Sequence, residues 1–540
     1  MAALLSVYDR TGIVPLAQAL AARGVAIYAT GGTRAHLREH GVDARDVEEL
    51  TGYPSLFDGR VKTLHPNVFG GILKDRDNPV HRAEAEKHNI PTISTVVVNL
   101  YPFEATIAKE GATLQEAIEQ IDIGGVSLLR AAAKNFDHVT VLSDPAQYAP
   151  FLEALANGGL DHATRRIYAT RAFERTAEYD SAIARYLESG LLANELPGSL
   201  ALTIPIEQPL RYGENPQDRA AFYLAREAQL PEQLGGKALS YNNLLDLDAT
   251  LRLLVRAPLA LRQAQGDGEP ARRHPEPHPR HPELVEGPSS VEGRVRAAIV
   301  KHTIPCGVAE RPGVADAVRE ALAADPVSAY GGIIAVDAPI DAAAAEHLAG
   351  FFLEIVAAPA FDDAALARLR KKKNLRIMRF RPGAPERFAA ELRVRSALGG
   401  VLAEDDDPQS PPEQWSVVSK RQPTDAEWRD LVFAWDLVRH VKSNGVVIAR
   451  DGVSRGICAG QTNRVSAVQI AAHRAHAFAA GAACASDGFF PFADGLLAAA
   501  DAGCTAVIAP QGSIRDAEVI AAADERGIAL VFSTYRYFLH

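Results

Sequence analysis

The sequence predicts an α/β protein whose first domain is a doubly wound parallel sheet. Up to about residue 140, short apolar runs alternate with segments whose apolar residues have helical spacing. Short apolar runs of this kind are typical of strands in a parallel sheet that is buried on both faces. Beyond them, further apolar runs alternate with alanine-rich helical segments, and 540 residues are too many for one hydrophobic core. We therefore expect at least two α/β domains.

The expected elements follow one another in chain order. In the first domain we expect strands at 4–7, 25–29, 96–98 and 139–142, and helices at 12–22 and 164–189. In the second we expect strands at 297–300, 332–336, 445–449 and 506–509. A Leu-Pro-Gly linker at 196–198 separates the domains, so we expect them to span 1–195 and 200–540. The length of the second domain predicts two subdomains, with a boundary in the region 380–415.

One segment, 263–292, differs from the rest of the chain. It is rich in Pro, His, Arg, Gly and Glu, and it repeats His-Pro-Glu and Val-Glu-Gly. Such a composition buries too little apolar surface to fold, so we interpret the segment as an inserted surface loop. A metal-binding histidine tract is the alternative.

Composition excludes several classes of function. Hydrophobic content of 47% with 23% charged residues is typical of a soluble globular protein, and a net charge of −10 argues against nucleic acid as a partner. We expect neither a signal peptide nor a membrane span. The four cysteines form no C-x-x-C pair, which suits a reducing cytoplasm and argues against disulfides and structural zinc.

A first candidate site follows two neighbouring strands of the first domain. Thr30-Gly31-Gly32-Thr33 comes after a strand and opens a helix, where backbone N–H groups and the helix N-terminus favour an anion. A tight turn with an N-cap would explain the same residues. Ser6 and Arg10, at the end of the first strand, would reach the same edge of a parallel sheet. This convergence favours a phosphate site.

Two further polar clusters belong to the same domain. The heptapeptide RVKTLHP places Arg60 and Lys62 at alternate positions, which in an extended segment would face one side. Downstream, Asp122 precedes a Gly-Gly pair and Lys134 ends an alanine run. A solvated basic strand, a turn aspartate and an exposed lysine would explain each separately. Together they supply the side chains of an anion-binding pocket.

A second candidate site lies far downstream, at Lys301-His302. This pair ends an apolar strand, a common place for functional residues, and histidine has an ordinary pKa near 6.5 that suits proton transfer. A capped strand end is the alternative. Adjacent strand residues face opposite ways, so both side chains reach one ligand only if the backbone turns here. Cations also stand beside aromatic rings at Arg211-Tyr212 and near the C-terminus, and Asp487 precedes a phenylalanine-rich run.

Taken together, these motifs resemble one family. RVKTLHP, NLYPF, IDIGG, AAAKN, RYGENP, KALSYNN, KSN, AGQ and FFPF occur in the order expected of the bifunctional purine biosynthesis proteins, in which a transformylase acting on aminoimidazole carboxamide ribonucleotide (AICAR) is joined to IMP cyclohydrolase. The resemblance covers the chain except 263–292. It implies a methylglyoxal-synthase-like first domain that closes the purine ring, and two cytidine-deaminase-like subdomains, without zinc, that transfer a formyl group from 10-formyltetrahydrofolate to AICAR.

The resemblance also implies partners and residue roles. It implies small-molecule nucleotide and folate substrates, no metal, no prosthetic group, a cytoplasmic location and a homodimer whose transformylase sites draw on both chains. The catalytic residues that it implies are Lys62, Tyr101, Asp122 and Lys134 for ring closure, and Lys301, His302 and Asn444 for formyl transfer. The substrate-binding residues that it implies are Ser6, Arg10, Thr30, Gly31, Gly32, Thr33, Arg60, Thr63, Arg211, Tyr212, Asn243, Phe489, Arg536 and Phe538.

Several positions depart from the family pattern. Arg10 replaces a lysine, Tyr8 a serine and Phe69 a histidine, and further departures are Gln217-Asp218, Gly488 and Ala493. Two other functions remain open at this stage. A regulatory protein that senses a phosphate ligand would need only the phosphate loop. An enzyme with a single activity would result if the departures or the insertion disabled one site.

Overall fold

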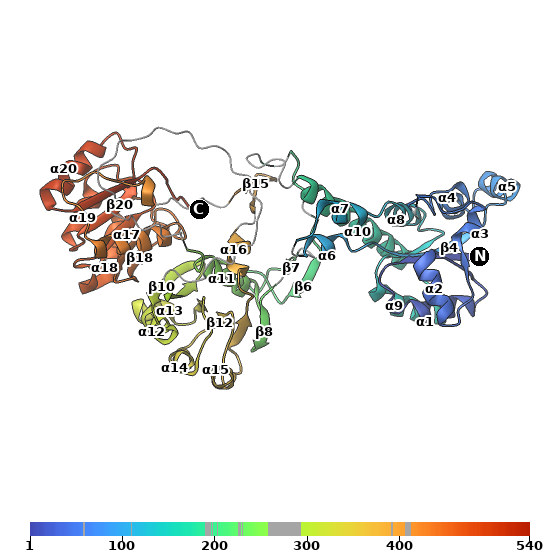
Figure 1. The fold of residues 1–540 in the computed structure, drawn as a ribbon, viewed down its shortest axis with the longest axis horizontal. Coiled ribbons are helices and arrows are strands. Elements are labelled where there is room, and N and C mark those ends of the chain that lie inside the picture. Colours follow the sequence, from blue (N-terminus) through green and yellow to red (C-terminus); the bar gives the residue numbers. More distant parts are fainter. Residues whose placement is uncertain are drawn as a thin grey trace. The chain divides into compact units, whose positions relative to one another are not determined.

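The computed structural model describes residues 1–57, 60–109, 111–188, 196, 198–201, 203–224, 228, 230–256, 293–389, 392–405 and 412–540. These residues form two compact units (Figure 1). The first consists of Met1–Ile206 with Tyr223–Ala228, and the second of the remaining described residues. The segment 263–292, interpreted above as an inserted loop, lies outside the described residues.

The first unit contains a five-stranded parallel sheet in the order β3-β2-β1-β4-β5. Its strands are β1 (Ala2–Val7), β2 (Ala26–Ala29), β3 (Ala44–Asp46), β4 (Ile93–Asn99) and β5 (Thr140–Leu142). The four strands expected in this domain are all present. Strand β3 was not expected, because three residues with two charges at the sheet edge carry no apolar run.

Helices connect and cover these strands. They are α1 (Ile13–Ala21), α2 (Gly31–Glu39), α3 (Val47–Thr51), α4 (Pro66–Leu73), α5 (Pro79–Lys87), α6 (Phe103–Ile107), α7 (Leu114–Glu119), α8 (Gly124–Lys134), α9 (Tyr148–Ala156) and α10 (His162–Glu188). Strands β1 and β4 are buried almost throughout. The strand order reverses between them, and such a switch point is where open α/β sheets bind ligands.

The second unit contains a twelve-stranded mixed sheet. The order is β16-β21-β20-β19-β17-β18-β10-β9-β11-β12-β13-β8. Its strands are β8 (Glu232–Gly235), β9 (Val295–Lys301), β10 (Ile304–Arg311), β11 (Ile333–Val336), β12 (Ile355–Ala358), β13 (Arg376–Arg379), β16 (Ser416–Val417), β17 (Val446–Arg450), β18 (Val453–Cys458), β19 (Ala483–Ser486), β20 (Ala506–Pro510) and β21 (Ala529–Ser533). Two small two-stranded sheets lie outside this sheet, β6 (Ile206–Leu210) with β7 (Ala220–Tyr223) and β14 (Arg393–Ala397) with β15 (Gly400–Glu404).

The two halves of this sheet are built alike, and we call them the first repeat (β8 to β13) and the second repeat (β16 to β21). In each, an edge strand precedes a helix, an antiparallel hairpin and three further strands, of which the last two continue the sheet in parallel. Gly307 and Gly456 hold equivalent places in the two hairpins. A Cβ on either glycine would come within 2.2 Å or 2.0 Å of a helix carbonyl oxygen, so both mark close helix–sheet packing.

The helices of the second unit follow the same duplication. Before the hairpin comes α11 (Tyr241–Arg252) in the first repeat and α17 (Asp425–Val438) in the second, and both begin with a capping box. The remaining helices are α12 (Val314–Ala324), α13 (Pro326–Ala329), α14 (Ala342–Gly350), α15 (Asp363–Leu369), α16 (Ala384–Ala389), α18 (Arg464–Ala475), α19 (Asp494–Asp501) and α20 (Asp516–Arg526). Helices α11 and α17 share one hydrophobic core that spans both repeats, whereas each repeat has its own core beneath its other helices.

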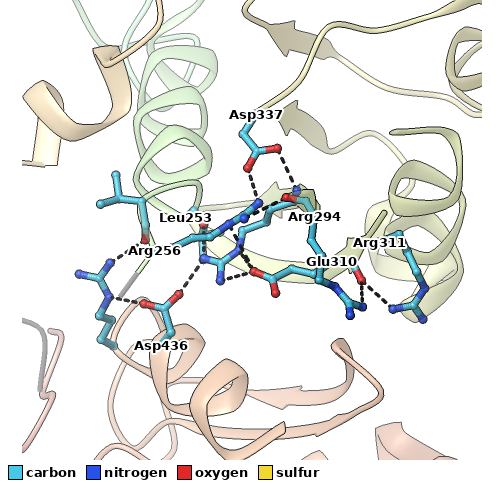
Figure 2. A network of polar contacts seen from close by, with 10 residues as sticks. Leu253, Arg256, Arg294, Glu310, Arg311, Asp337 and Asp436 are labelled. Carbon is cyan, nitrogen blue, oxygen red and sulfur yellow. Dashed lines mark hydrogen bonds and ion pairs between the residues drawn. The ribbon is translucent and has the colours of Figure 1, made fainter. Parts of the chain in front are cut away.

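A buried ion network joins the two repeats (Figure 2). Arg296 on β9 donates to Glu310 at 2.8 Å and to Asp436 on α17 at 2.7 Å, and its side chain is only 3% exposed. Asp337 accepts a backbone bond from Arg296 at 2.9 Å and pairs with Arg256. Burial alone would lower the pKa of Arg296, but Glu310 and Asp436 outweigh it and raise that pKa. The network therefore fixes β9 against α17.

The structure bears on two of the expectations drawn from composition, those on cysteines and on membrane spans. All four cysteines are free thiols. In the described part of the chain, every helix is too short or too polar to cross a membrane.

Candidate functional sites

The first site lies where β1 ends, at the switch point of the parallel sheet. Ser6 Oγ and Thr30 Oγ1 are 2.9 Å apart, and Thr33 Oγ1 bonds both the N–H and the carbonyl of Val7 at 3.0 Å. These bonds hold the start of α2 against β1. The Thr30 side chain makes no cap bond to α2. The first N–H groups of the helix are thus available to an anion.

Two cations converge on the glycine pair that opens α2. A Cβ on Gly32 would come within 2.9 Å of Arg10 Nη2, and a Cβ on Gly31 within 3.7 Å of Lys62 Nζ. The absence of side chains at both positions lets the cations approach the backbone. The structure therefore brings Arg10 to the TGGT turn, as expected from the sequence, and it also brings Lys62 there.

Asp122 lies beside this cluster in a tightly bonded turn. Its Oδ1 accepts the Gly125 N–H at 2.6 Å, and its own N–H donates to Tyr179 Oη at 2.9 Å. Tyr179 Oη donates in turn to the Gln120 carbonyl at 2.6 Å. Burial raises the pKa of Asp122, and burial with the nearby Asp122 charge raises the pKa of Tyr101. Both groups therefore hold their protons to higher pH than an exposed carboxyl or phenol would.

The remaining expected residues of this unit lie in different surroundings. Thr63 Oγ1 would be 3.0 Å from a Cβ on Gly124, so it lies at the start of α8. Arg60 is exposed and forms an ion pair with Glu119, whereas Lys62 points to Gly31. Residues 60–62 form no regular strand, only an isolated bridge from Val61 to Leu56. Lys134 is exposed at the last position of α8.

One residue at this edge was not singled out from the sequence. Asn99, at the end of β4, accepts the N–H groups of Tyr8 and Asp9 at 2.6 Å and 2.9 Å and donates to the Asp9 carbonyl at 2.8 Å. It therefore shapes the loop after β1, and an asparagine directly after an apolar run was the signal. Tyr8 makes its bond through the backbone, and its ring meets Tyr101 edge-on with centroids 6.3 Å apart.

The second site is centred on the hairpin turn between β9 and β10. Lys301 pairs with Ile304, so the turn consists of His302 and Thr303 alone. Both have positive φ, 56° and 60°. The chain thus turns at the point where the sequence required it. Asp246 on α11 accepts the N–H groups of both turn residues, at 3.2 Å and 2.6 Å, and Lys301 Nζ donates to the Tyr330 carbonyl at 2.8 Å.

Two cavities meet this turn. One of about 310 Å³ is lined by Lys301 and His302, with Arg455 and Arg474 among its walls. The other, of about 650 Å³, is lined by His302 and Asp246. The basic residues that line this larger cavity are Arg252, Arg393, Arg395, Arg439 and Lys442. Glu214 and Asp248 also line the larger cavity, where basic residues outnumber acidic ones. A histidine beside basic residues can bind an anionic substrate and move its proton.

Asn444 belongs to a cluster at the start of β17. Its Oδ1 accepts Arg464 Nη2 at 2.6 Å, and its Nδ2 donates to the Gln461 carbonyl at 2.8 Å. Arg464, which the sequence did not single out, also pairs with the fully buried Asp487. At Gly488 a Cβ would meet Arg464 Nη2 at 2.5 Å and the Phe538 ring at 2.7 Å, so the glycine allows their approach.

The other expected binding residues are distributed over four segments. Arg536 stacks on Phe538, and Arg211 on Tyr212, with guanidinium-to-centroid distances of 4.6 Å and 5.4 Å. Asn243 is buried and completes the capping box of α11. Phe489 is half-buried. Asp218, at one of the departures from the family pattern, accepts the Asn215 N–H at 3.2 Å.

The fold and the two sites indicate an α/β enzyme of the bifunctional class, in which each of two units carries its own basic site. Sequence comparison identifies the family. A model of the MGS-like domain matches residues 12–127, and a model of the AICARFT/IMPCHase bienzyme matches residues 132–264 and 283–474. The chain belongs to this AICARFT/IMPCHase family, whose members are bifunctional transferases and hydrolases of purine biosynthesis.

Relatives match over the full length. The bifunctional purine biosynthesis protein PurH of Magnetococcus marinus is 45% identical and that of Chloroflexus aurantiacus 47% identical. Each alignment covers 100% of this chain, with 99% and 98% of the relative. The recognition from sequence motifs is confirmed, and so is the bifunctional activity of the chain as AICAR formyltransferase and IMP cyclohydrolase.

Proposed function

We propose that the second unit forms formyl-AICAR from AICAR and 10-formyltetrahydrofolate, and that the first unit closes formyl-AICAR to IMP. The observation that carries this proposal is the presence of two basic sites, one at the β1/β4 switch point and one at the His302 turn, in a chain that matches bifunctional relatives throughout. In this assignment residues 1–195 are the cyclohydrolase and 200–540 the transformylase.

The transformylase is assigned two cytidine-deaminase-like subdomains without zinc, divided within 380–415. The duplicated strand order supports this, because the first repeat ends with β13 and the second begins with β16. Residues 406–411 belong to this boundary region and are not among the described residues.

Formyl transfer needs a proton acceptor and oxyanion donors. The amine of AICAR is a weak nucleophile because its lone pair is delocalised into the ring and the carboxamide. His302 takes the amine proton as the C–N bond forms, directly or through the carboxamide, and returns it to the departing folate nitrogen. Lys301 and Asn444 donate to the oxygen of the tetrahedral carbon, and one such donor is worth about 3–4 kcal/mol. The position of His302 at both cavities supports its role.

The substrate-binding side chains of this site come from several segments. Arg536 and Arg211 are suited to the phosphate, Asn243 to the ribonucleotide, and the rings of Phe489 and Phe538 to stacking. The rings carried by Tyr212 and Phe538 each lie beside an arginine, which supports a shared role in binding. We propose that the enzyme is a homodimer whose transformylase sites draw on both chains.

Ring closure is intramolecular and needs less from the protein. The carboxamide nitrogen attacks the formyl carbon and water leaves, and holding the two groups together can supply about 7–11 kcal/mol. Lys62 and Lys134 stabilise the oxygen, and Tyr101 and Asp122 carry the proton. The phosphate is held by Ser6, Arg10, Thr30, Gly31, Gly32 and Thr33, with Arg60 and Thr63 at the edge of the pocket.

Neither step calls for more than acid–base and oxyanion chemistry, so folate is a cosubstrate and no prosthetic group or metal is required. The acidic net charge of −10 supports small molecules, rather than nucleic acid, as partners. The cytoplasm, where purine nucleotides are made, is the proposed location, without attachment to a membrane.

The test of the proposed function is to incubate the purified protein with AICAR and 10-formyltetrahydrofolate and follow tetrahydrofolate and IMP together. Both products should accumulate. Tetrahydrofolate with accumulating formyl-AICAR would contradict the role of the first unit. If neither forms, direct addition of formyl-AICAR decides between a cyclohydrolase alone, which makes IMP, and a protein that only binds ligand.

Lys134→Ala should slow ring closure by about 10²- to 10³-fold, because it removes one proposed oxyanion donor. Formyl transfer should be unchanged, since Lys134 belongs to the first unit. The rate of IMP formation from formyl-AICAR measures the effect. The matched control is Lys87→Ala, which removes an exposed lysine at the end of α5. Ring closure at the unaltered rate in Lys134→Ala would remove this residue from the mechanism.

A further inference from the structure

The turn that carries His302 has an unusual composition for its geometry. A two-residue hairpin turn with positive φ at both positions normally contains Asn-Gly, Asp-Gly or Gly-Gly. Here the residues are His302 and Thr303, with φ of 56° and 60°. A β-branched residue such as threonine rarely adopts positive φ, so local sequence preference alone does not explain this turn.

The Asp246 carboxylate stabilises this turn through two hydrogen bonds. Its two carboxylate oxygens accept the N–H groups of His302 at 3.2 Å and Thr303 at 2.6 Å. Bonds from backbone N–H groups to a carboxylate are charge-assisted and therefore strong. Asp246 is the sixth residue of α11, whose N-terminus is fixed by its capping box. The carboxylate thus ties the turn to a well-anchored helix.

The second repeat contains the same carboxylate-to-turn bonds, but its turn carries no histidine. Asp430 is the sixth residue of α17, and its carboxylate accepts the N–H groups of Asp451 at 2.9 Å and Gly452 at 2.8 Å. These two residues form the turn between β17 and β18, with φ of 56° and 66°. An Asp-Gly turn suits this geometry by itself. The carboxylate clamp therefore belongs to the duplicated fold, and only the first repeat places a histidine on it.

We propose that Asp246 is a positioning residue for the transformylase. It holds His302 and Thr303 at positive φ, so that the imidazole and the Lys301 side chain both reach one substrate. This rests on the proposed role of His302. Asp246 acts through the backbone of the turn rather than by proton transfer. Geometry at a reacting centre is demanding, and a shift of about 1 Å can cost about 10²-fold in rate.

The test compares Asp246→Asn with Asp430→Asn in the full-length enzyme. Each change keeps the shape of the side chain and replaces one acceptor oxygen by an amide. Asp246→Asn should lower the kcat of formyl transfer by about 10- to 100-fold and leave the KM for AICAR within about twofold. Asp430→Asn should leave formyl transfer nearly unchanged. Ring closure by the first unit, measured on the same samples, should be unaffected and reports intact protein.

A second change separates positioning from direct contact with substrate. Thr303→Gly places a residue that accepts positive φ in the turn. In the double variant Asp246→Asn/Thr303→Gly, most of the lost kcat should return if Asp246 acts by holding the turn. No recovery would overturn the inference, and so would equal losses in Asp246→Asn and Asp430→Asn.

A failure of the proposed function can be distinguished from a failure of the positioning role of Asp246. If the unaltered enzyme forms no tetrahydrofolate, or if His302→Ala retains full activity, the role of His302 is wrong and the inference falls with it. If His302→Ala is inactive while Asp246→Asn keeps the full kcat, only the positioning role is overturned.

Discussion

Replacing His302 with alanine should lower the kcat of formyl transfer by about 10²- to 10⁴-fold, the usual contribution of a general acid–base group. His302 lines two cavities and lies on a turn whose backbone N–H groups are held by the Asp246 carboxylate. Without the imidazole, the weakly nucleophilic amine keeps its proton as the C–N bond forms. The rate of tetrahydrofolate release with AICAR in excess measures the effect.

Two controls make this result specific. Ring closure should be unchanged in His302→Ala, because the first unit carries the other site. His347→Ala removes a histidine from α14, which faces neither cavity, and should leave both activities intact. A His302→Ala enzyme with near-normal formyl transfer would show that another group manages the proton.

Removing the carboxylate of Asp436 should destabilise the second unit by about 3–5 kcal/mol, the usual cost of breaking a buried ion pair by deleting one partner. Asp436 is 4% exposed, accepts Arg296 at 2.7 Å and also pairs with Arg439 at 3.3 Å. In Asp436→Ala the guanidinium groups of Arg296 and Arg439 stay buried without this carboxylate. Chemical denaturation, followed through the loss of formyl transfer and of tryptophan fluorescence, measures the change.

An exposed ion pair provides the matched control. Glu232 pairs with Arg379 at the edge of the sheet, and both side chains are at least half exposed. Such pairs contribute about 0–1 kcal/mol, so Glu232→Ala should shift the unfolding midpoint only slightly. Equal shifts in the two variants would mean that the network in Figure 2 contributes no more than a surface pair.

The sequence predicted features that depend on local pattern. Strands such as β1 and β4 were recognised because a buried parallel strand must be apolar throughout. The convergence of Arg10 with the Thr30–Thr33 turn followed from a general rule, since neighbouring parallel strands end at the same edge of a sheet. The turn at Lys301-His302 was required for both side chains to reach one ligand, and the structure contains it.

Features that depend on distant partners were not predicted. Asp246 bonds residues 56 and 57 positions away, and Arg464 reaches Asn444 from 20 positions away, so neither carries a local signal. Two subdomains of one kind were expected in the second unit, but the correspondence between their hairpin turns was not. The equivalent turns read His302-Thr303 and Asp451-Gly452, which share no residue, because packing preserves backbone shape rather than side-chain identity.

One contact of the ion network has a consequence for how such a chain can change over time. Arg256 Nη1 donates to the Arg294 carbonyl at 3.0 Å, although the two residues are 38 positions apart in sequence. The acceptor in this contact is a backbone carbonyl, which every residue type offers, whereas the donor is an arginine side chain. As far as this contact is concerned, substitution at position 294 leaves the bond in place and substitution at position 256 removes it. The two ends of one bond are therefore under unequal evolutionary constraint.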